Sequence, residues 1–200
     1  NYKQLRDILI ADGHQFKTKT DSEVLVHGFE EWNTGLLNKL RGMFAFAIWN
    51  KKEQSLFLAR DFFGIKPMHY MVQDGHLVYA SEIKSILDFP GFEKKLNRNA
   101  LNNYLSFEYP VPPETFFEGV YSLPPAHYLW YRNGKVEVKR YWEPKFQPDD
   151  SMSEQDAVDE IDRVFEDSVA AHRISDVEVG CFLSGGVDSS YVASYFKGQK

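Results

Sequence analysis

Two dipeptides that favour tight turns limit the folds open to this sequence more than any other feature. Asp74-Gly75 separates the runs HYMV and HLVYAS, and Asn133-Gly134 separates YLWYR from KVEVKRYW. Both dipeptides supply the positive φ angles that two-residue hairpin turns require, and the flanking runs are rich in β-branched and aromatic residues. The runs MFAFAIW (43–49) and SLFLAR (55–60) flank the segment NKKEQ. The sequence therefore predicts three antiparallel hairpins.

Helical patterns precede the hairpins. Residues 2–12 carry leucines and isoleucines and are followed by a glycine, which is typical of a helix that ends at a C-cap. A second helix is predicted over residues 21–32, where Thr20 and Glu23 form a capping box before an apolar run. Helices beside antiparallel strands predict an α+β domain over residues 1–142.

The C-terminal part has a different pattern. Residues 143–152 carry prolines and acidic side chains and are interpreted as a linker. Ser153 then begins an amphipathic helix, the strand-like run VEVGCFL follows at 177–183, and a polar loop leads into SSYVASYFK. Helix, strand, loop and helix in this order predict the start of a parallel α/β domain over residues 153–200. A strand in such a sheet needs partners on both sides, so the chain is interpreted as a fragment.

Composition argues against several classes of function. The formal net charge is −6, whereas a protein that mainly binds nucleic acid needs a basic face. The sequence has no apolar run long enough to predict a membrane span. The single cysteine, Cys181, excludes a disulfide framework and favours a reducing compartment, so we expect a cytoplasmic protein. Cys181 itself lies in the predicted strand and is expected to be a small buried apolar residue.

The loop over residues 184–190, with the sequence SGGVDSS, is the candidate binding site of the C-terminal part. It joins the predicted strand to a helix, which is where open α/β sheets bind ligands and where free N–H groups attract anions. The loop lacks the lysine of a Walker A loop and the spacing of a dinucleotide site. Asp188 is a candidate Mg²⁺ ligand beside a pyrophosphate. The alternative is a turn in which Asp188 and Ser189 only cap the helix.

The string SGGVDSS after an apolar strand resembles the PP-loop of ATP pyrophosphatases, which cleave ATP between the α and β phosphates. The chain as a whole resembles the glutamine-hydrolysing asparagine synthetases of the asparagine synthase B type. The segments that carry this resemblance, in order, are TDSEVL (20–25), LRGMFAFAIWN (40–50), RDFFGIKPMHY (60–70), YASEIKSIL (79–87), LPPAHYL (123–129) and SDVEVGCFLSGGVDSS (175–190). The resemblance implies an Ntn-hydrolase-like glutaminase domain with antiparallel sheet, followed by the PP-loop synthetase domain.

The resemblance also assigns roles to particular residues. It implies that Asp21 binds the α-amino group of glutamine and that Asp188 binds Mg²⁺. The residues expected to bind ATP are Leu183, Ser184, Gly185, Gly186, Asp188, Ser189 and Ser190. The glutaminase nucleophile of the family is an N-terminal cysteine, and this cysteine is expected before Asn1, like the segments that hold glutamine and form the oxyanion hole. No catalytic residue is therefore expected within this chain.

Three further residues are expected to have structural roles. Arg60 and Asp61 are expected to form a buried pair that fixes the sheet, and Ser81 is expected to cap a short helix packed on it. By contrast, Asp21 is not needed for the cap of its own helix, because the capping box already supplies one.

The resemblance implies a ligase that makes L-asparagine from L-aspartate with ammonia from L-glutamine, through β-aspartyl-AMP and release of pyrophosphate from ATP. Its small-molecule partners would be glutamine, aspartate and ATP, and a homodimer is compatible with it. One alternative is a homologous PP-loop amide ligase for another carboxylate, of the β-lactam synthetase or peptide cyclase type. Another is a non-catalytic homologue that serves as a binding or regulatory module. The residue after the initiator methionine of the full-length protein distinguishes these readings, because a cysteine there supports glutaminase activity and any other residue supports the alternative ligase.

Overall fold

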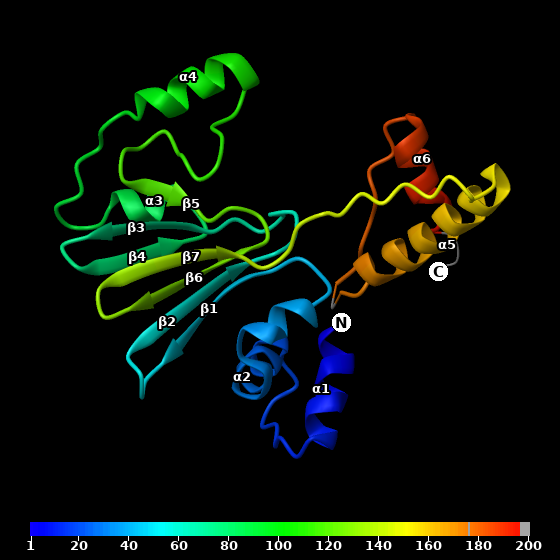
Figure 1. Cartoon of the computed structure of the whole chain (residues 1–200), viewed down its shortest axis with the longest axis horizontal. Helices are drawn as coiled ribbons and strands as arrows, with labels where there is room; N and C mark the ends of the chain where they lie inside the picture. Colours follow the sequence, from blue (N-terminus) through cyan, green and yellow to red (C-terminus); the bar gives the residue numbers. More distant parts are fainter. Residues whose placement is uncertain (176, 197–200) are drawn as a thin grey trace. The chain divides into compact units, whose positions relative to one another are not determined.

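The computed structural model describes residues 1–175 and 177–196 (Figure 1). The chain divides into two compact units, Tyr2–Pro144 and Lys145–Lys200, and Asn1 is grouped with the second unit. The first unit consists of helices and antiparallel strands, whereas the described part of the second contains helices only. Among the described residues, no helix is both long and apolar enough to cross a membrane.

The first unit begins with α1 (Tyr2–Ala11), α2 (Asp21–Trp32) and the 3₁₀ helix η1 (Asn33–Asn38). α1 ends in a Schellman motif, in which Gly13 has a φ of +97° and the His14 N–H donates to the Leu9 carbonyl oxygen at 2.9 Å. The two predicted helices are therefore confirmed. α1 and α2 pack against each other through the buried side chains of Leu5, Leu9 and Val24.

The strands of the first unit form two sheets. One has the order β1-β2-β6-β7 and comprises β1 (Ala45–Asn50), β2 (Ser55–Arg60), β6 (His127–Arg132) and β7 (Lys135–Arg140). The other has the order β4-β3-β5 and comprises β3 (His69–Gln73), β4 (His76–Ala80) and β5 (Val120–Ser122). All neighbouring strands are antiparallel. The three predicted hairpins are confirmed, and Asp74 and Asn133 have φ values of +52° and +51° in their turns.

Two further helices, α3 (Ile83–Leu87) and α4 (Arg98–Phe107), lie between β4 and β5 in the sequence. The predicted cap of α3 is wrong, because its N-cap residue is Glu82 and no side chain caps it. The helix begins two residues after Ser81, so the serine does not hold the position from which a hydroxyl reaches the first N–H groups.

Alternate side chains of the central strand β2 face different hydrophobic clusters, and this fixes the order of the layers. Leu58 packs with Tyr70 of β3, so the two sheets stack face to face. Phe57, one residue earlier, points the other way and packs with Leu37 of η1. On the far side of the second sheet, Met71 packs with α3. The first unit therefore has the layers helix, sheet, sheet and helix (Figure 1).

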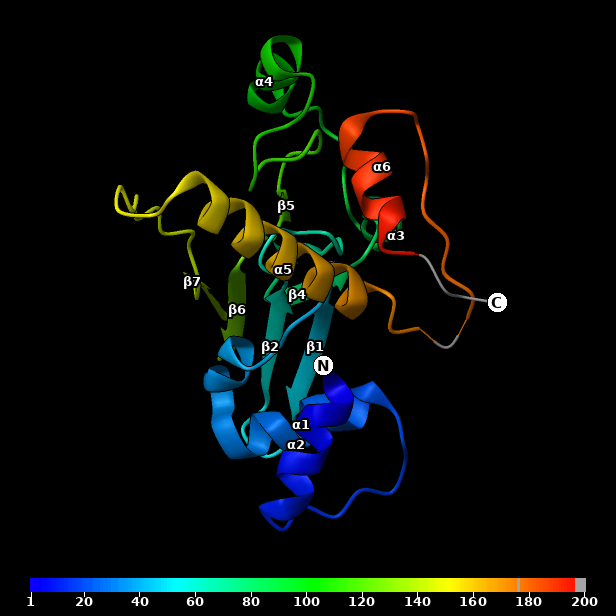
Figure 2. The ribbon, with the colours of Figure 1, turned by 90° about the vertical axis from the view of Figure 1, so that its right-hand side faces the viewer.

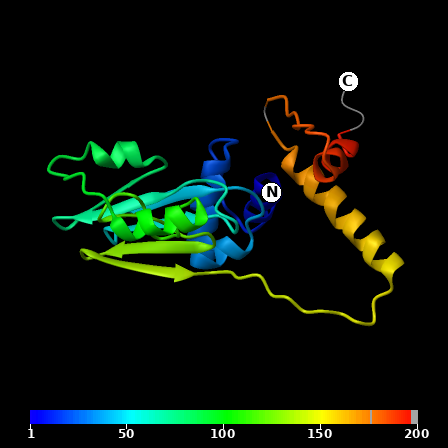
Figure 3. The ribbon, with the colours of Figure 1, turned by 90° about the horizontal axis from the view of Figure 1, so that it is seen from above.

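The second unit contains α5 (Glu154–His172) and α6 (Val187–Ser194), with the polar loop leading into α6 (Figure 2). α5 begins after its predicted N-cap, Ser153, whose hydroxyl oxygen accepts a hydrogen bond from the Asp156 N–H at 3.2 Å. Residues 143–152, the expected linker, contain neither helix nor strand (Figure 3).

The predicted strand at 177–183 is wrong. These residues form neither helix nor strand, and Cys181 and Phe182 are exposed instead of buried. A parallel strand needs hydrogen-bonded neighbours, and the described part of this unit holds no other strand. The apolar side chains of the run therefore have no second layer to pack against.

Candidate functional site

Asp21 is the candidate glutamine contact, and it lies in the first turn of α2. Its side chain is exposed, and its Oδ1 accepts a hydrogen bond from the Ser22 hydroxyl at 3.3 Å. The helix is capped by Thr20, whose Oγ1 accepts a hydrogen bond from the Glu23 N–H at 3.4 Å. Asp21 therefore does not cap the helix, and its carboxylate is accessible to a ligand.

The loop before Asp21 is fixed by Glu23. The Glu23 carboxylate accepts hydrogen bonds from the Lys17 N–H at 2.7 Å, from the Thr18 N–H at 2.6 Å and from the Thr18 hydroxyl. The bond from Lys17 is the largest of the causes that lower the pKa of Glu23 to about 2. The predicted capping box is thus only half correct, because Glu23 binds the preceding loop and not the N–H of Thr20. This clamp orders the residues that lead to Asp21.

The loop after β2 is held by a buried carboxylate. Asp61 is 1% exposed, and its Oδ1 accepts hydrogen bonds from the N–H groups of Phe63 and Ile65 at 3.2 and 3.0 Å. Its Oδ2 accepts hydrogen bonds from the N–H groups of Lys66 and Phe44 at 2.9 and 3.3 Å. Asp61 therefore closes the loop and ties it to the residue that precedes β1.

Arg60 binds the main chain of the same loop. Its Nε donates to the Lys66 carbonyl oxygen at 2.7 Å, and its Nη2 donates to the Gly64 carbonyl oxygen at 2.8 Å. Its Nη1 donates to the Leu123 carbonyl oxygen at 2.6 Å, next to β5. Burial lowers the pKa of Arg60, and the nearby Asp61 opposes this shift. The expected structural role is found, but the expected pairing is wrong, because both side chains bind main-chain groups of the loop.

In the second unit, the polar loop surrounds the N-terminus of α6. The first N–H groups of a helix have no partner within it, and Gly186 at the N-cap provides no side-chain cap. Gly185 has a φ of +83°, and no atom lies within 4 Å of the position where a Cβ would stand. The main chain is therefore open to the close approach of an anion at this helix end.

Three serine hydroxyls line this loop. Those of Ser184 and Ser189 are 3.0 Å apart, and Ser189 and Ser190 donate to the Gly186 carbonyl oxygen at 3.1 and 2.8 Å. A hydroxyl can rotate from these internal bonds to a bound anion. The loop thus gathers the glycines and serines named by the sequence around one helix end.

Asp188 and Leu183 are also exposed, as an ATP contact requires. Asp188 lies in the first turn of α6 with an exposed side chain, so its carboxylate is accessible to a hard cation such as Mg²⁺. The capping contact that the alternative expects from Asp188 and Ser189 is not found, because no side chain caps this helix.

α6 is held against α5 by a carboxylate that the sequence prediction missed. Asp162 of α5 accepts hydrogen bonds from the hydroxyls of Tyr191, at 2.6 Å, and Tyr195. These bonds raise the pKa of both tyrosines and lower that of Asp162. The Tyr191 ring also lies 4.3 Å from that of Phe165, between centroids. This contact orients the helix whose N-terminus carries the loop.

Comparison with known protein families follows the same division of the chain. A family described as "Glutamine amidotransferase domain" matches residues 1–142. The chain belongs to this family. A second family, described as "Asparagine synthase", matches residues 160–200. The two matches in one chain confirm the resemblance to the glutamine-hydrolysing asparagine synthetases.

Curated relatives of this amidotransferase chain carry two kinds of name. A putative glutamine-hydrolysing asparagine synthetase of Mycobacterium tuberculosis (strain H37Rv) is 41% identical over 202 residues, which cover 97% of this chain and 31% of the relative. Amidase chry2 of Gibberella zeae is 38% identical over 189 residues, which cover 92% of this chain and 27% of the relative. The chain thus spans less than a third of the length of these relatives.

Among solved structures, that of the allosteric regulatory enzyme of purine biosynthesis resembles this amidotransferase chain. The TM-score is 0.50 and the sequence identity 19%, over 98% of this chain and 40% of that one. At this identity the likeness concerns the fold alone. It agrees with the stacked antiparallel sheets of the first unit and confirms the predicted α+β class.

The contacts that the sequence prediction missed join residues that are not adjacent in the sequence. The clamp of Glu23 on Lys17 has no recognised pattern, although an acid three residues after a threonine did mark the helix start. The partners of Asp162 lie 29 and 33 residues away, so no local spacing connects them. An acid on the apolar side of an amphipathic helix was the one available signal, and two tyrosines on the next helix supplied its partners.

Proposed function

We propose that this chain is part of an enzyme that makes L-asparagine from L-aspartate, with ATP as the source of energy and L-glutamine as the source of ammonia. The observation that carries the proposal is the order of the two family matches in one chain. A glutamine amidotransferase domain precedes the start of an asparagine synthase domain, and the matched part of the latter contains the polar loop.

On the glutamine side, Asp21 would bind the α-ammonium group of the substrate. The proposal is supported by its exposed carboxylate, by the Thr20 cap that leaves this carboxylate free, and by the Glu23 clamp that orders the preceding loop. A hydrogen bond between an ammonium group and a carboxylate is charge-assisted and therefore stronger than a neutral one.

On the ATP side, the loop at the start of α6 would bind the phosphates. The free N–H groups, the open space beside Gly185 and the serine hydroxyls are compatible with a pyrophosphate anion. Asp188 would hold Mg²⁺, which neutralises phosphate oxygens and orients them when it is bound. The loop lacks the lysine that binds the terminal phosphates in Walker A sites, which favours cleavage between the α and β phosphates.

The proposed synthesis has two steps. An oxygen of the aspartate side-chain carboxylate forms a bond to the α-phosphorus of ATP, and the bond to pyrophosphate breaks. Ammonia then attacks the activated carbonyl carbon, loses a proton and displaces AMP. Ammonia is supplied by hydrolysis of the glutamine amide, so glutamate is the second product.

The full-length protein tests this proposal through its products and through two single replacements. It should convert ATP to AMP and pyrophosphate; formation of ADP would contradict the assignment of the loop. Asp21→Ala removes a charge-assisted bond worth about 1.5–3 kcal/mol, so glutamine-dependent synthesis should fall about tenfold to a hundredfold. Synthesis from free ammonia should persist in this variant.

Asp188→Ala should have the opposite pattern. Both synthetic routes need activated aspartate, so both should be lost, whereas glutamine hydrolysis should continue. Asp7→Ala, which replaces an exposed acid of α1, serves as the matched control and should leave all three activities unchanged. If Asp21→Ala abolishes synthesis from ammonia in a folded protein, Asp21 is not a glutamine contact.

One relative is named as an amidase and not as an asparagine synthetase, so the acceptor is tested separately. In the second candidate function the same loop activates a carboxylate other than that of aspartate. Supplying the full-length protein with aspartate and with a panel of other carboxylic acids distinguishes the two, because pyrophosphate release should depend on the true acceptor. A protein that releases no pyrophosphate with any acid would instead be a non-catalytic homologue.

A further inference from the structure

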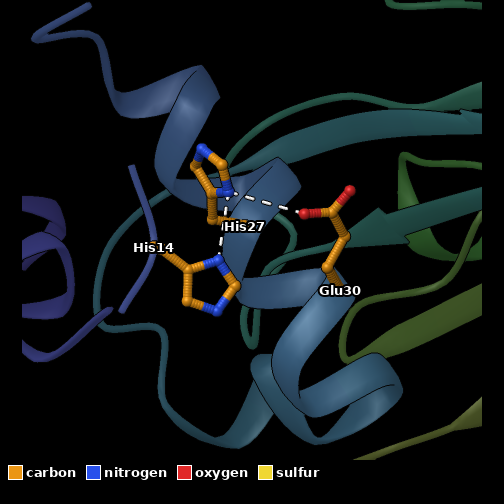
Figure 4. Close-up of side chains that lie close together, drawn as sticks. All are labelled: His14, His27 and Glu30. Atoms are coloured by element: carbon orange, nitrogen blue, oxygen red, sulfur yellow. Dashed lines mark hydrogen bonds and ion pairs between the residues drawn. The ribbon is translucent and has the colours of Figure 1, made fainter. Parts of the chain in front are cut away.

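Two histidines and a glutamate converge between the end of α1 and the middle of α2 (Figure 4). His14 lies in the segment after α1, and His27 and Glu30 lie on α2. The Nδ1 atoms of the two histidines are 3.2 Å apart, and His27 Nδ1 is 3.5 Å from Glu30 Oε2. One ligand atom from each of the three residues lies within 4.8 Å of the others. We propose that this His14–His27–Glu30 cluster is a Zn²⁺-binding site.

Two of the three distances within the cluster match the edges of a tetrahedral zinc site. The third, between His14 and Glu30, is at most 4.8 Å and would shorten by rotation of the Glu30 side chain, which is 65% exposed. Zinc binds imidazole nitrogen and carboxylate oxygen at about 2.0–2.2 Å, so neighbouring ligand atoms of a tetrahedron lie about 3.3–3.6 Å apart. The observed separations of 3.2 and 3.5 Å therefore need little adjustment. Two imidazoles and one carboxylate suit zinc better than Mg²⁺ or Ca²⁺, which prefer oxygen ligands alone.

A second pair of carboxylates favours the tautomers that such a site requires. Glu31 Oε2 lies 3.1 Å from His14 Nε2, and Glu23 Oε1 lies 3.7 Å from His27 Nε2. A carboxylate accepts hydrogen bonds and cannot donate them, so both contacts favour a proton on Nε2. The lone pairs on the two Nδ1 atoms then face each other and Glu30. A cation between these acceptors removes their mutual repulsion. Metal-bound histidines commonly have such a carboxylate on the other ring nitrogen.

The surrounding residues also favour metal binding by orienting an imidazole and by supplying negative charge. The ring of Phe16 lies 4.5 Å from that of His27, between centroids, and restricts its orientation. Among the described residues, the charged groups in contact with the two imidazoles include the carboxylates of Glu23, Glu30 and Glu31, and the Arg6 guanidinium lies over the adjacent Phe16 ring. Their net negative charge favours a divalent cation. Three protein ligands leave the fourth position of the tetrahedron for water or another donor.

The experiment is a Zn²⁺ titration of the metal-free 200-residue chain against a chromophoric chelator, together with thermal unfolding. The wild-type chain should bind one equivalent of Zn²⁺ and unfold at a higher temperature when it is bound. His27→Gln should abolish this binding. Glu30 is 65% exposed, so Glu30→Gln tests the site in a variant whose fold is preserved, and it should weaken binding.

Two further variants separate a built site from general attraction to acids. Glu31→Gln removes only the carboxylate next to His14 Nε2 and should weaken binding about tenfold to a hundredfold. His76→Gln replaces an exposed histidine of β4 and should bind Zn²⁺ like the wild type. The proposal is overturned if the wild type takes up no Zn²⁺, if His27→Gln binds equally well, or if nitrogen NMR shows a shared proton between the imidazoles that Zn²⁺ does not displace. None of these outcomes depends on asparagine synthesis.

Discussion

Replacing Asp61 by asparagine would test how much the buried carboxylate stabilises the first unit. Asparagine has nearly the shape of aspartate, but it has one acceptor oxygen and an NH₂ group that donates. An oxygen in place of Oδ1 can keep the hydrogen bonds from the Phe63 and Ile65 N–H groups. The NH₂ group then takes the place of Oδ2 and faces the N–H groups of Phe44 and Lys66. The NH₂ donors are thereby set against two N–H donors at the position of a buried side chain.

The magnitude follows from these two lost bonds. A hydrogen bond to a charged group stabilises a folded protein by about 1.5–3 kcal/mol, so Asp61→Asn should lower the free energy of unfolding by about 3–6 kcal/mol. The total free energy of unfolding of a typical domain is about 5–15 kcal/mol. The variant should therefore fold only marginally, and its urea midpoint should fall steeply.

Tryptophan fluorescence during urea unfolding measures the loss of unfolding free energy in the first unit. The four tryptophans, Trp32, Trp49, Trp130 and Trp142, all lie in the first unit. Asp74→Asn is the matched control, because asparagine is favoured at the positive φ of that hairpin turn and the change should stay within about 0.5 kcal/mol. If Asp61→Asn also stays within about 0.5 kcal/mol of the wild type, the four-bond account of Asp61 is refuted.

Three further predictions follow from contacts described above. Because the pKa of Glu23 is lowered from 4.5 to about 2, its clamp stabilises the fold above pH 4.5 and is lost as the pH falls through 2. The amide resonances of the loop residue Lys17 should therefore titrate near pH 2, and a midpoint near 4.5 would contradict the clamp. Gly64→Ala places a Cβ 2.8 Å from Pro125 Cγ at a φ of +68°. It should therefore destabilise the first unit by about 1–3 kcal/mol, measured by the same fluorescence assay. An unchanged urea midpoint would show that the loop moves to accommodate the added Cβ. Asp162→Asn should lower the raised pKa values of its two tyrosine partners toward the ordinary value, and an ultraviolet titration unchanged from the wild type would disprove those hydrogen bonds.

The hairpins and the N-terminal helices could be predicted because their signals are local. A positive φ at Asn133 depends on the residue type at that position, and the Thr20 cap depends on atoms three residues apart. The strand predicted at 177–183 failed because a parallel strand depends on neighbours that the run itself cannot supply. The apolar composition of the run can be read from the segment itself. Its burial depends on neighbouring elements that the segment does not specify.

The candidate sites show the same limit. The sequence marked Asp21 and the polar loop as candidates, because a first-turn acid and the string SGGVDSS are recognisable patterns. It did not predict that Arg60 and Asp61 would each bind main-chain groups, since carbonyl and N–H groups carry no sequence signature. The His14–His27–Glu30 cluster was missed for a related reason: thirteen residues separate the two histidines, and only the packing of α1 on α2 brings them together.

The burial of β2 on both faces has a consequence for the motions of the first unit. Every residue from Ser55 to Ala59 is buried, and the strand is hydrogen-bonded to β1 on one side and β6 on the other. Its amide protons can exchange with solvent only when the layers separate, so β2 should exchange at the rate of global unfolding. The strand runs directly into the loop closed by Asp61, so this loop is attached to the part of the unit that opens last. The clamp beside Asp21, by contrast, lies at an exposed helix start and can open without disturbing that centre.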